Sequence, residues 1–150
     1  MVYPAGTREW RAAPSNTPVQ TAATARAIDS ATNSAAKSKE IAITFPGVYR
    51  IKFGLTAPTG GGAAAYSVGQ IYRNGVAVGT LRTTAPGAAT TKHEFTEDIG
   101  GWEANDLCQL YVHNVGGAAA GDVFGFVIFA DYAQMPPQIP AGAVQTDTAV

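Results

Sequence analysis

The residues of this chain that could do chemistry are two histidines, one cysteine, a few serines and a group of carboxylates. His93 opens the stretch "HEFTEDIGG", where histidine and carboxylate side chains together could hold a metal ion. In a β-strand Glu97 would share the face of His93 and Glu94 would lie on the opposite face, so the acids are divided. A cupin-type metal motif also needs two histidines at alternate positions, and only the distant His113 could join. We therefore favour solvated or interface histidines and expect no metal and no cofactor.

Nucleophilic catalysis finds no support in the sequence. No serine lies within the G-x-S-x-G pattern of a nucleophile turn. Cys108 is the only cysteine, which excludes an internal disulfide and a cysteine-based zinc site. In "LCQLYVHN" the Cys108 side chain is in phase with Leu110 and Val112, which predicts a buried and unreactive thiol. We expect that the protein is not an enzyme.

One stretch, "GGWEAND", combines an aromatic residue with polar groups in a predicted turn. Its members are Trp102, Glu103, Asn105 and Asp106. Glycan-binding loops use an aromatic platform beside Asn, Asp or Gln side chains, and acids paired in a turn could also bind calcium. We favour a solvated turn and keep this stretch as the candidate ligand loop.

The elements that would position these residues are β-strands, because the apolar pattern from Lys39 onward has a period of two. "KEIAITF" and "VYRIKFGL" each place large apolar residues on one face. Asn74-Gly75 separates "YSVGQIYR" from "VAVGTLRT" and predicts a tight hairpin, because both central residues of a type I′ turn need positive φ. With "TKHEFTEDI", "LCQLYVHN" and "DVFGFVIFADY", the pattern gives seven strands.

An eighth strand is expected between Val19 and Ile28, where we favour extended chain over a short alanine-rich helix. The predicted fold is an all-β antiparallel jelly-roll sandwich of about eight strands. Residues 1–18 form a proline-containing N-terminal arm, residues 19–132 the jelly-roll domain and residues 133–150 a proline-rich C-terminal arm. The large apolar residues expected to anchor these arms in a partner are Tyr3, Trp10, Met135 and Ile139.

The last predicted strand is apolar on both faces. Strict alternation places Phe124, Phe126 and Ile128 on one face and Val123, Val127 and Phe129 on the other. Neither face suits water, so one would meet the opposite sheet and the other would need a cover. A neighbouring subunit is the cover we favour, and an arm folded back over the strand is the alternative.

Composition limits the partners of the chain. Charged residues make up 14% of it, against about 25% in typical soluble domains, so much of the surface is small and weakly polar, as expected of an assembly component. A net charge of −1 offers no basic field for nucleic acid or an anionic membrane. No stretch approaches the roughly 18 apolar residues of a membrane span, and no leader pattern opens the chain.

The charges are unevenly distributed along the chain. Every lysine and arginine lies at or before Lys92, whereas most of the acids follow it. We favour neutralisation within one folded subunit, because the two halves of a sheet protein interleave. Charge complementarity between neighbouring subunits is the alternative.

Four stretches together resemble the jelly-roll domains related to the tumour-necrosis-factor and complement globular-head folds. They are "KEIAITFPGVYRIKFGL", "GQIYRNGVAVGT", "FTEDIGGWEANDLCQLYVHN" and "VFGFVIF", within about residues 39–132. In that group a strand after a Gly-Tyr-type turn, a central hairpin, a Gly-Asp-type turn and an aromatic last strand recur in this order. The chain departs from the group at Ala104-Asn105-Asp106, where a Gly-Asp turn is usual.

The resemblance implies a homotrimer that is formed about the face carrying the last strand. Small jelly rolls with extended arms also resemble bacteriophage capsid decoration proteins, which cement capsomers from outside the shell. The expected protein is therefore a virion structural protein, made in the host cytoplasm, that binds the major capsid protein or another virion protein at the capsid surface. The alternative is a trimeric tail-fibre or receptor-binding head that recognises a glycan or host surface.

Overall fold

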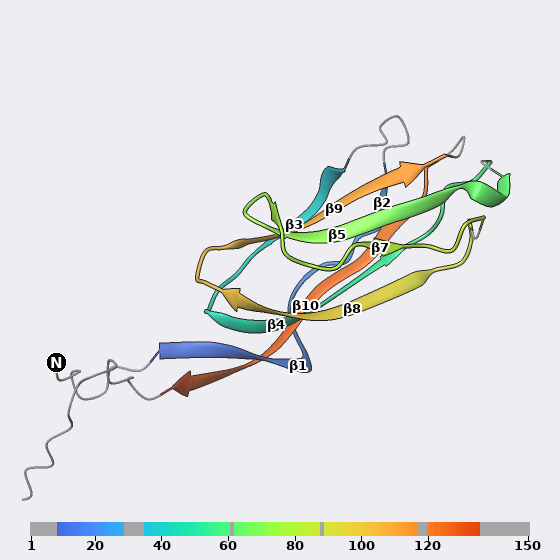
Figure 1. Cartoon of the computed structure of the whole chain (residues 1–150). Coiled ribbons are helices and arrows are strands. Elements are labelled where there is room, and N and C mark those ends of the chain that lie inside the picture. The colour runs from blue at the N-terminus through green and yellow to red at the C-terminus, as the bar shows by residue number, and fades with distance from the viewer. Residues whose placement is uncertain (1–8, 29–34, 61, 88, 117–119, 136–150) are drawn as a thin grey trace, which may run out of the picture.

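A computed structural model of the protein describes residues 9–28, 35–60, 62–87, 89–116 and 120–135. These residues form ten β-strands and one short 3₁₀ turn, Gly62–Ala64, with no α-helix among them. The strands make two five-stranded sheets that pack face to face as a β-sandwich (Figure 1). The predicted all-β sandwich is confirmed.

The first sheet, sheet A, has the strand order β2-β10-β1-β4-β8, with a further pairing between β10 and β4. Its strands are β1 (Glu9–Ala22), β2 (Arg26–Ala27), β4 (Gly47–Leu55), β8 (His93–Trp102) and β10 (Asp122–Met135). Almost all pairings in this sheet are antiparallel, and the exception is one parallel bridge between Ala12 and Gly47.

The second sheet, sheet B, has the order β3-β9-β5-β6, and β7 also pairs with β5. Its strands are β3 (Ala36–Ala42), β5 (Tyr66–Arg73), β6 (Val76–Ala77), β7 (Arg82–Thr83) and β9 (Leu107–Val115). The predicted hairpin is confirmed: Asn74 and Gly75 have φ of 49° and 83° between β5 and β6. The sequence predicted about eight strands and the described residues form ten, because the predicted strand "VAVGTLRT" is divided into β6 and β7, and the predicted strand between Val19 and Ile28 is divided between β1 and β2.

The core lies between the two sheets and follows the predicted alternation on β4 and β9. Tyr49, Ile51 and Phe53 are buried on β4, because the intervening Arg50 and Lys52 point to the outer face. Sheet B contributes the buried side chains of Cys108, Leu110 and Val112 from β9. The buried position predicted for Cys108 is confirmed.

The predicted faces of β10 are wrong at one point. Gly125 has a φ of +62° at a β-bulge between Phe124 and Val127, and the extra residue shifts the alternation by one. As a result Val123 and Phe126, predicted on opposite faces, are both fully buried in the core. Phe124 lies on the outer face, where its ring covers Gly54 of β4. Ile128 is in the core as expected for a residue in phase with Phe126.

The predicted N-terminal arm is in part a strand of the sandwich. Residues 9–18 are extended as expected, but they belong to β1 and pair with β10. Residues 19–28 are not helical: residues 19–22 end β1, a bend follows, and residues 26–27 form β2. At the other end β10 continues to Met135, so residues 133–135 of the predicted C-terminal arm lie in sheet A. Tyr3 and Ile139 lie outside the described residues.

Candidate functional site

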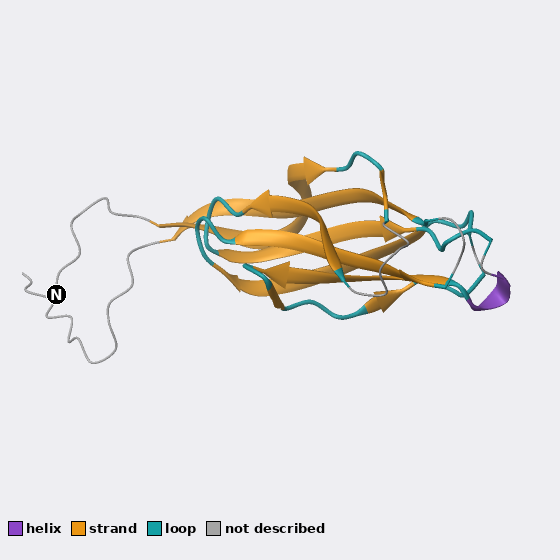
Figure 2. Cartoon of the chain, turned by 90° about the horizontal axis from the view of Figure 1, so that it is seen from above, coloured by secondary structure: helices purple, strands orange, loops and turns teal. Residues whose placement is uncertain are grey.

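The two terminal strands meet at one end of the sandwich. β1 begins where β10 ends, with Glu9 opposite Met135 and Trp10 opposite Gln134, and this antiparallel ladder continues to Ala13. Figure 2 shows both strands leaving the sandwich on the same side. The first and last described residues, Glu9 and Met135, are therefore neighbours in sheet A.

The start of β1 is held in place by its contact with the turn before β4. The amide of Ala12 donates to the carbonyl of Pro46 at 2.8 Å. Gly47 has a φ of +140°, and a Cβ at this position would collide with the backbone of Ala12. Glycine is required here because β1 approaches β4 too closely for any side chain. This contact fixes where the first strand crosses the end of the sheet.

Four aromatic side chains gather at this end, and we call them the terminal aromatic cluster: Trp10, Phe45, Tyr49 and Tyr132. The ring centroid of Phe45 lies 5.9 Å from that of Trp10 and 4.8 Å from that of Tyr132. Tyr49 anchors the cluster in the core, where its hydroxyl donates to the Phe45 carbonyl at 2.7 Å and its burial raises the pKa of the phenol. Trp10 remains 42% exposed. The cluster thus presents a partly exposed aromatic surface, backed by the core, at the end of the sandwich where β1 begins and β10 ends.

The structure places two of the four predicted arm anchors, Trp10 and Met135, in strands of sheet A. Trp10 packs against its own chain through Phe45, so only part of its ring is free for a partner. Met135 is the last residue of β10, and its backbone is opposite Glu9. Phe45 and Tyr132 were not singled out from the sequence, because only long-range contacts of β1 bring Trp10 beside them. β1 meets the turn that follows Phe45 and pairs with β10, which carries Tyr132.

A second surface is the outer face of β10, where three half-buried side chains form an apolar stripe: Phe124, Val127 and Phe129. The Lys92 ammonium lies 5.1 Å from the centroid of the Phe124 ring, in cation-π contact. Val127 is opposite Lys52 and Phe129 is opposite Arg50 on the neighbouring β4. The stripe is therefore apolar along β10 and bordered by charge on β4.

Ion pairs form the charged border of the apolar stripe. Arg50 binds the Asp98 carboxylate through two nitrogens at 2.8 and 3.0 Å, and Lys52 lies 3.1 Å from Glu94. The hydrogen bond from Arg50 holds the pKa of the Asp98 carboxyl below its usual range. Arg50 also donates to Asn16 of β1 at 2.8 Å, which ties the middle of β1 to this face. These pairs join bases from the first half of the chain to acids from the second half, so they support neutralisation within one subunit.

The candidate ligand loop has no exposed aromatic side chain, because its tryptophan is buried. Trp102 is only 1% exposed, because β8 continues through it and the guanidinium of Arg73 lies 4.4 Å above its ring. Asp106 accepts hydrogen bonds from the Glu103 amide at 2.9 Å and the Asn74 side chain at 2.8 Å, and the first bond lowers the pKa of its carboxyl. A buried Trp102 cannot serve as the exposed aromatic platform of a glycan-binding loop, and the corner is held by internal contacts. Glu103 and Asn105 are exposed.

The two histidines lie in different sheets, and Cys108 is enclosed in the core. His93 begins β8 in sheet A and His113 lies on β9 in sheet B. No group of three or more His, Cys, Asp or Glu side chains suited to a metal ion occurs among the residues that the structure describes. Cys108 has no exposed surface, and burial raises the pKa of its thiol to about 12. A neutral, enclosed thiol is a poor nucleophile.

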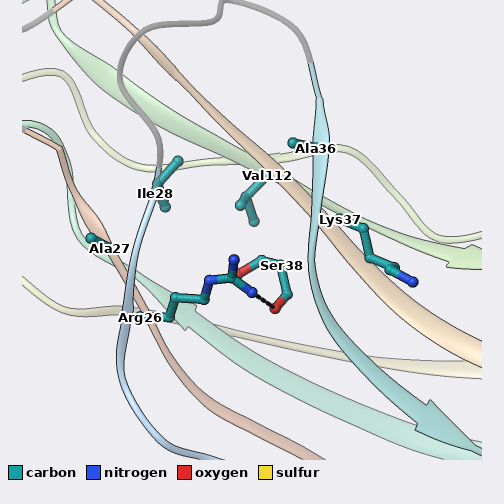
Figure 3. A pocket seen from close by; sticks show the side chains of 7 residues that line it. All are labelled: Arg26, Ala27, Ile28, Ala36, Lys37, Ser38 and Val112. Carbon is teal, nitrogen blue, oxygen red and sulfur yellow. Dashed lines mark hydrogen bonds between the residues drawn. The ribbon is translucent and has the colours of Figure 1, made fainter.

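A small pocket of about 70 Å³ lies between the edge strands β2 and β3 (Figure 3). Arg26 spans this gap and donates to the carbonyl oxygen of Ser38 at 3.0 Å. Figure 3 shows the Lys37 side chain directed away from Arg26, and its ammonium pairs with Glu40 at 2.8 Å. The pocket therefore holds one guanidinium rather than a convergent set of groups, and it joins the open edges of the two sheets.

Comparison of the chain with protein-family models gives no match, and comparison with curated proteins gives none either. Within the described ranges, no helix is long and apolar enough to cross a membrane. The surfaces available for a functional inference are the terminal aromatic cluster and the apolar stripe.

Proposed function

We propose that this protein is a non-enzymatic virion structural protein, a homotrimeric decoration protein that cements the outside of a phage-like capsid. The observation that carries the proposal is the pairing of β1 with β10, which places Glu9 and Met135 together at one end of the sandwich beside the half-exposed Trp10. A protein that attaches by this end can use both terminal segments and the terminal aromatic cluster against one partner surface.

We also propose that the sandwich is a jelly roll of the group related to the tumour-necrosis-factor and complement-head folds. The support is the strand order: β10 and β4 are paired in sheet A with β8 next to β4, and β3, β9 and β5 are neighbours in sheet B. From β3 onward the longer strands alternate between the sheets along the chain, β3 in B, β4 in A, β5 in B, β8 in A, β9 in B and β10 in A. Such repeated crossing between two sheets is typical of jelly rolls.

The apolar stripe is the surface we propose for trimer contacts. Its three side chains are half-buried in the single chain, and the neighbouring ion pairs supply a polar border. Protein interfaces commonly combine a desolvated apolar centre with a polar rim. A trimer would present three terminal aromatic clusters, so weak single contacts would combine into firm attachment through effective concentration.

The partner at the attachment end is the major capsid protein or another virion protein. Extended, proline-containing segments lose less ordering entropy on docking than flexible tails, and their free backbone groups can pair with the edge of a neighbouring sheet. Residues 1–8 and 136–150 contain the anchors Tyr3 and Ile139. Trp10 is the proposed anchor whose side chain the structure describes, and aromatic residues of this size often contribute most of the binding energy at an interface.

The test is retention on undecorated particles after dilution. We expect the full-length protein to stay bound, and Trp10→Ala or deletion of residues 136–150 to release it faster. Leu81→Ala is the matched control, because Leu81 is also exposed but lies before β7 in sheet B and outside the terminal aromatic cluster. Equal retention of all variants would refute attachment by this end, and would favour a tail-fibre or receptor-binding head that uses its loops.

A further inference from the structure

The hairpin turn Asn74-Gly75 is an Asn-Gly pair, a dipeptide that is prone to deamidation. In an Asn-Gly pair the glycine nitrogen can attack the asparagine side-chain carbonyl carbon, which closes a succinimide ring and releases ammonia. Water then opens the ring to give aspartate or isoaspartate. Glycine favours this reaction because it has no Cβ to obstruct the attack. The reaction needs a free glycine nitrogen and an asparagine side chain that can rotate.

Hydrogen bonds occupy all three of the groups that react or rotate. The Gly75 amide donates to Oε1 of Gln109 at 2.8 Å. The side chain of Asn74 donates through Nδ2 to Asp106 at 2.8 Å and accepts through Oδ1 from the Leu107 amide, also at 2.8 Å. The attacking Gly75 nitrogen is thus bound to Gln109 of β9, while the Asn74 nitrogen that would leave is bound to Asp106 in the turn before β9.

The orientation of Gln109 is fixed by its second partner. Its Nε2 donates to Oε2 of Glu40 at 2.8 Å, and the same carboxylate oxygen pairs with the Lys37 ammonium at 2.8 Å. The hydrogen bond from Lys37 lowers the pKa of the Glu40 carboxyl, so this group is an acceptor at neutral pH. Because Glu40 accepts and the Gly75 amide only donates, the Gln109 amide can satisfy both only with its oxygen toward Gly75. Gln109 itself is only 6% exposed.

We propose that Asn74 is a latent deamidation site, and that Gln109 keeps it unreactive while the hairpin is folded. Opening of the Gly75–Gln109 hydrogen bond frees the nitrogen for attack on Asn74. The product cannot restore the corner, because a carboxylate at position 74 has no N–H to donate and faces the carboxylate of Asp106. The modification therefore converts a brief local opening into a permanent change. This inference does not depend on the proposed function.

The experiment incubates the full-length protein in mildly alkaline buffer and measures aspartate and isoaspartate at position 74 by peptide mass mapping. We expect the folded protein to react at least about tenfold more slowly than the same chain in denaturant, because several hydrogen bonds must open first. Gln109→Leu should accelerate the reaction several-fold in the folded protein. Gln70→Leu is the control, because Gln70 lies on the same face of sheet B but its side chain donates to the Gly79 carbonyl.

A double exchange separates this chemistry from general loosening of the hairpin. Glu40→Gln combined with Gln109→Glu keeps an acceptor oxygen for the Gly75 amide and a donor–acceptor pair between the two side chains. We expect this variant to react nearly as slowly as the wild-type protein. Equal rates for folded and denatured wild-type chains would overturn the proposal, as would equal acceleration by Gln109→Leu and Gln70→Leu or a failure of the double exchange to restore protection.

Discussion

Truncation of two phenylalanines on β10 distinguishes the bulged strand from a regular one. Phe126 has no exposed surface and lies in the core, so Phe126→Ala should lower the free energy of unfolding by about 3–5 kcal/mol. Phe124 is half-buried on the outer face, where its ring covers Gly54 and meets the Lys92 ammonium. Phe124→Ala removes a phenyl group that is only about half buried and one exposed cation-π contact, so it should lower the free energy of unfolding by about 1–2 kcal/mol.

The assay is chemical denaturation monitored by fluorescence, with thermal unfolding as a second measurement. For a domain of this size about 1 kcal/mol corresponds to a change of roughly 2–4 °C in Tm, so Phe126→Ala should lower Tm by about 6–20 °C. In a strand without the Gly125 bulge, Phe124 and Phe126 would lie on the same face, and their truncation to alanine would lower the free energy of unfolding by the same amount. Equal losses for the two variants, or a larger loss for Phe124→Ala, would refute the bulged arrangement.

Three further predictions concern assembly, the thiol and acid stability. Phe129→Asp adds a charge to the apolar stripe, and sedimentation velocity should find a folded monomer in place of the trimer that we propose for the wild-type protein. Cys108 should resist a chromogenic thiol reagent in the native protein and react fully in denaturant, and Cys108→Ala should cost about 1–2 kcal/mol in unfolding free energy without loss of attachment. Because Arg50 lowers the folded-state pKa of Asp98, this carboxylate stabilises the fold above its unfolded pKa of about 3.9 and loses that effect as pH falls through the lower folded value. Asp98→Asn should therefore flatten the acid side of the stability–pH curve, measured by urea unfolding at a series of pH values.

Local patterns predicted the elements whose structure depends on near neighbours. The Asn74-Gly75 turn follows from backbone chemistry alone, because few other residue pairs adopt two consecutive positive φ angles. The inward face of β4 follows from strict alternation around Arg50 and Lys52. In both cases the information lies within a few residues.

Long-range contacts decided the elements that were predicted wrongly. Pro14 and Pro18 indicated an extended arm outside the sandwich, but β1 accommodates both at its irregular pairing with β10, where a missing amide costs least. Trp102 was grouped with its polar neighbours as a candidate ligand loop, but Arg73 from β5 covers its ring. Gly125 is compatible with either a regular strand or a bulge, and only the pairing with β4 selects the bulge.

The most direct test of the proposed function is an electron cryomicroscopy reconstruction of the native particle that carries this protein. We predict density for the sandwich on the outside of the shell, grouped in threes, with the Glu9 and Met135 end directed at the capsid and the apolar stripes facing one another. Sandwiches in the tail, or a decoration protein with the opposite end against the shell, would contradict the proposal.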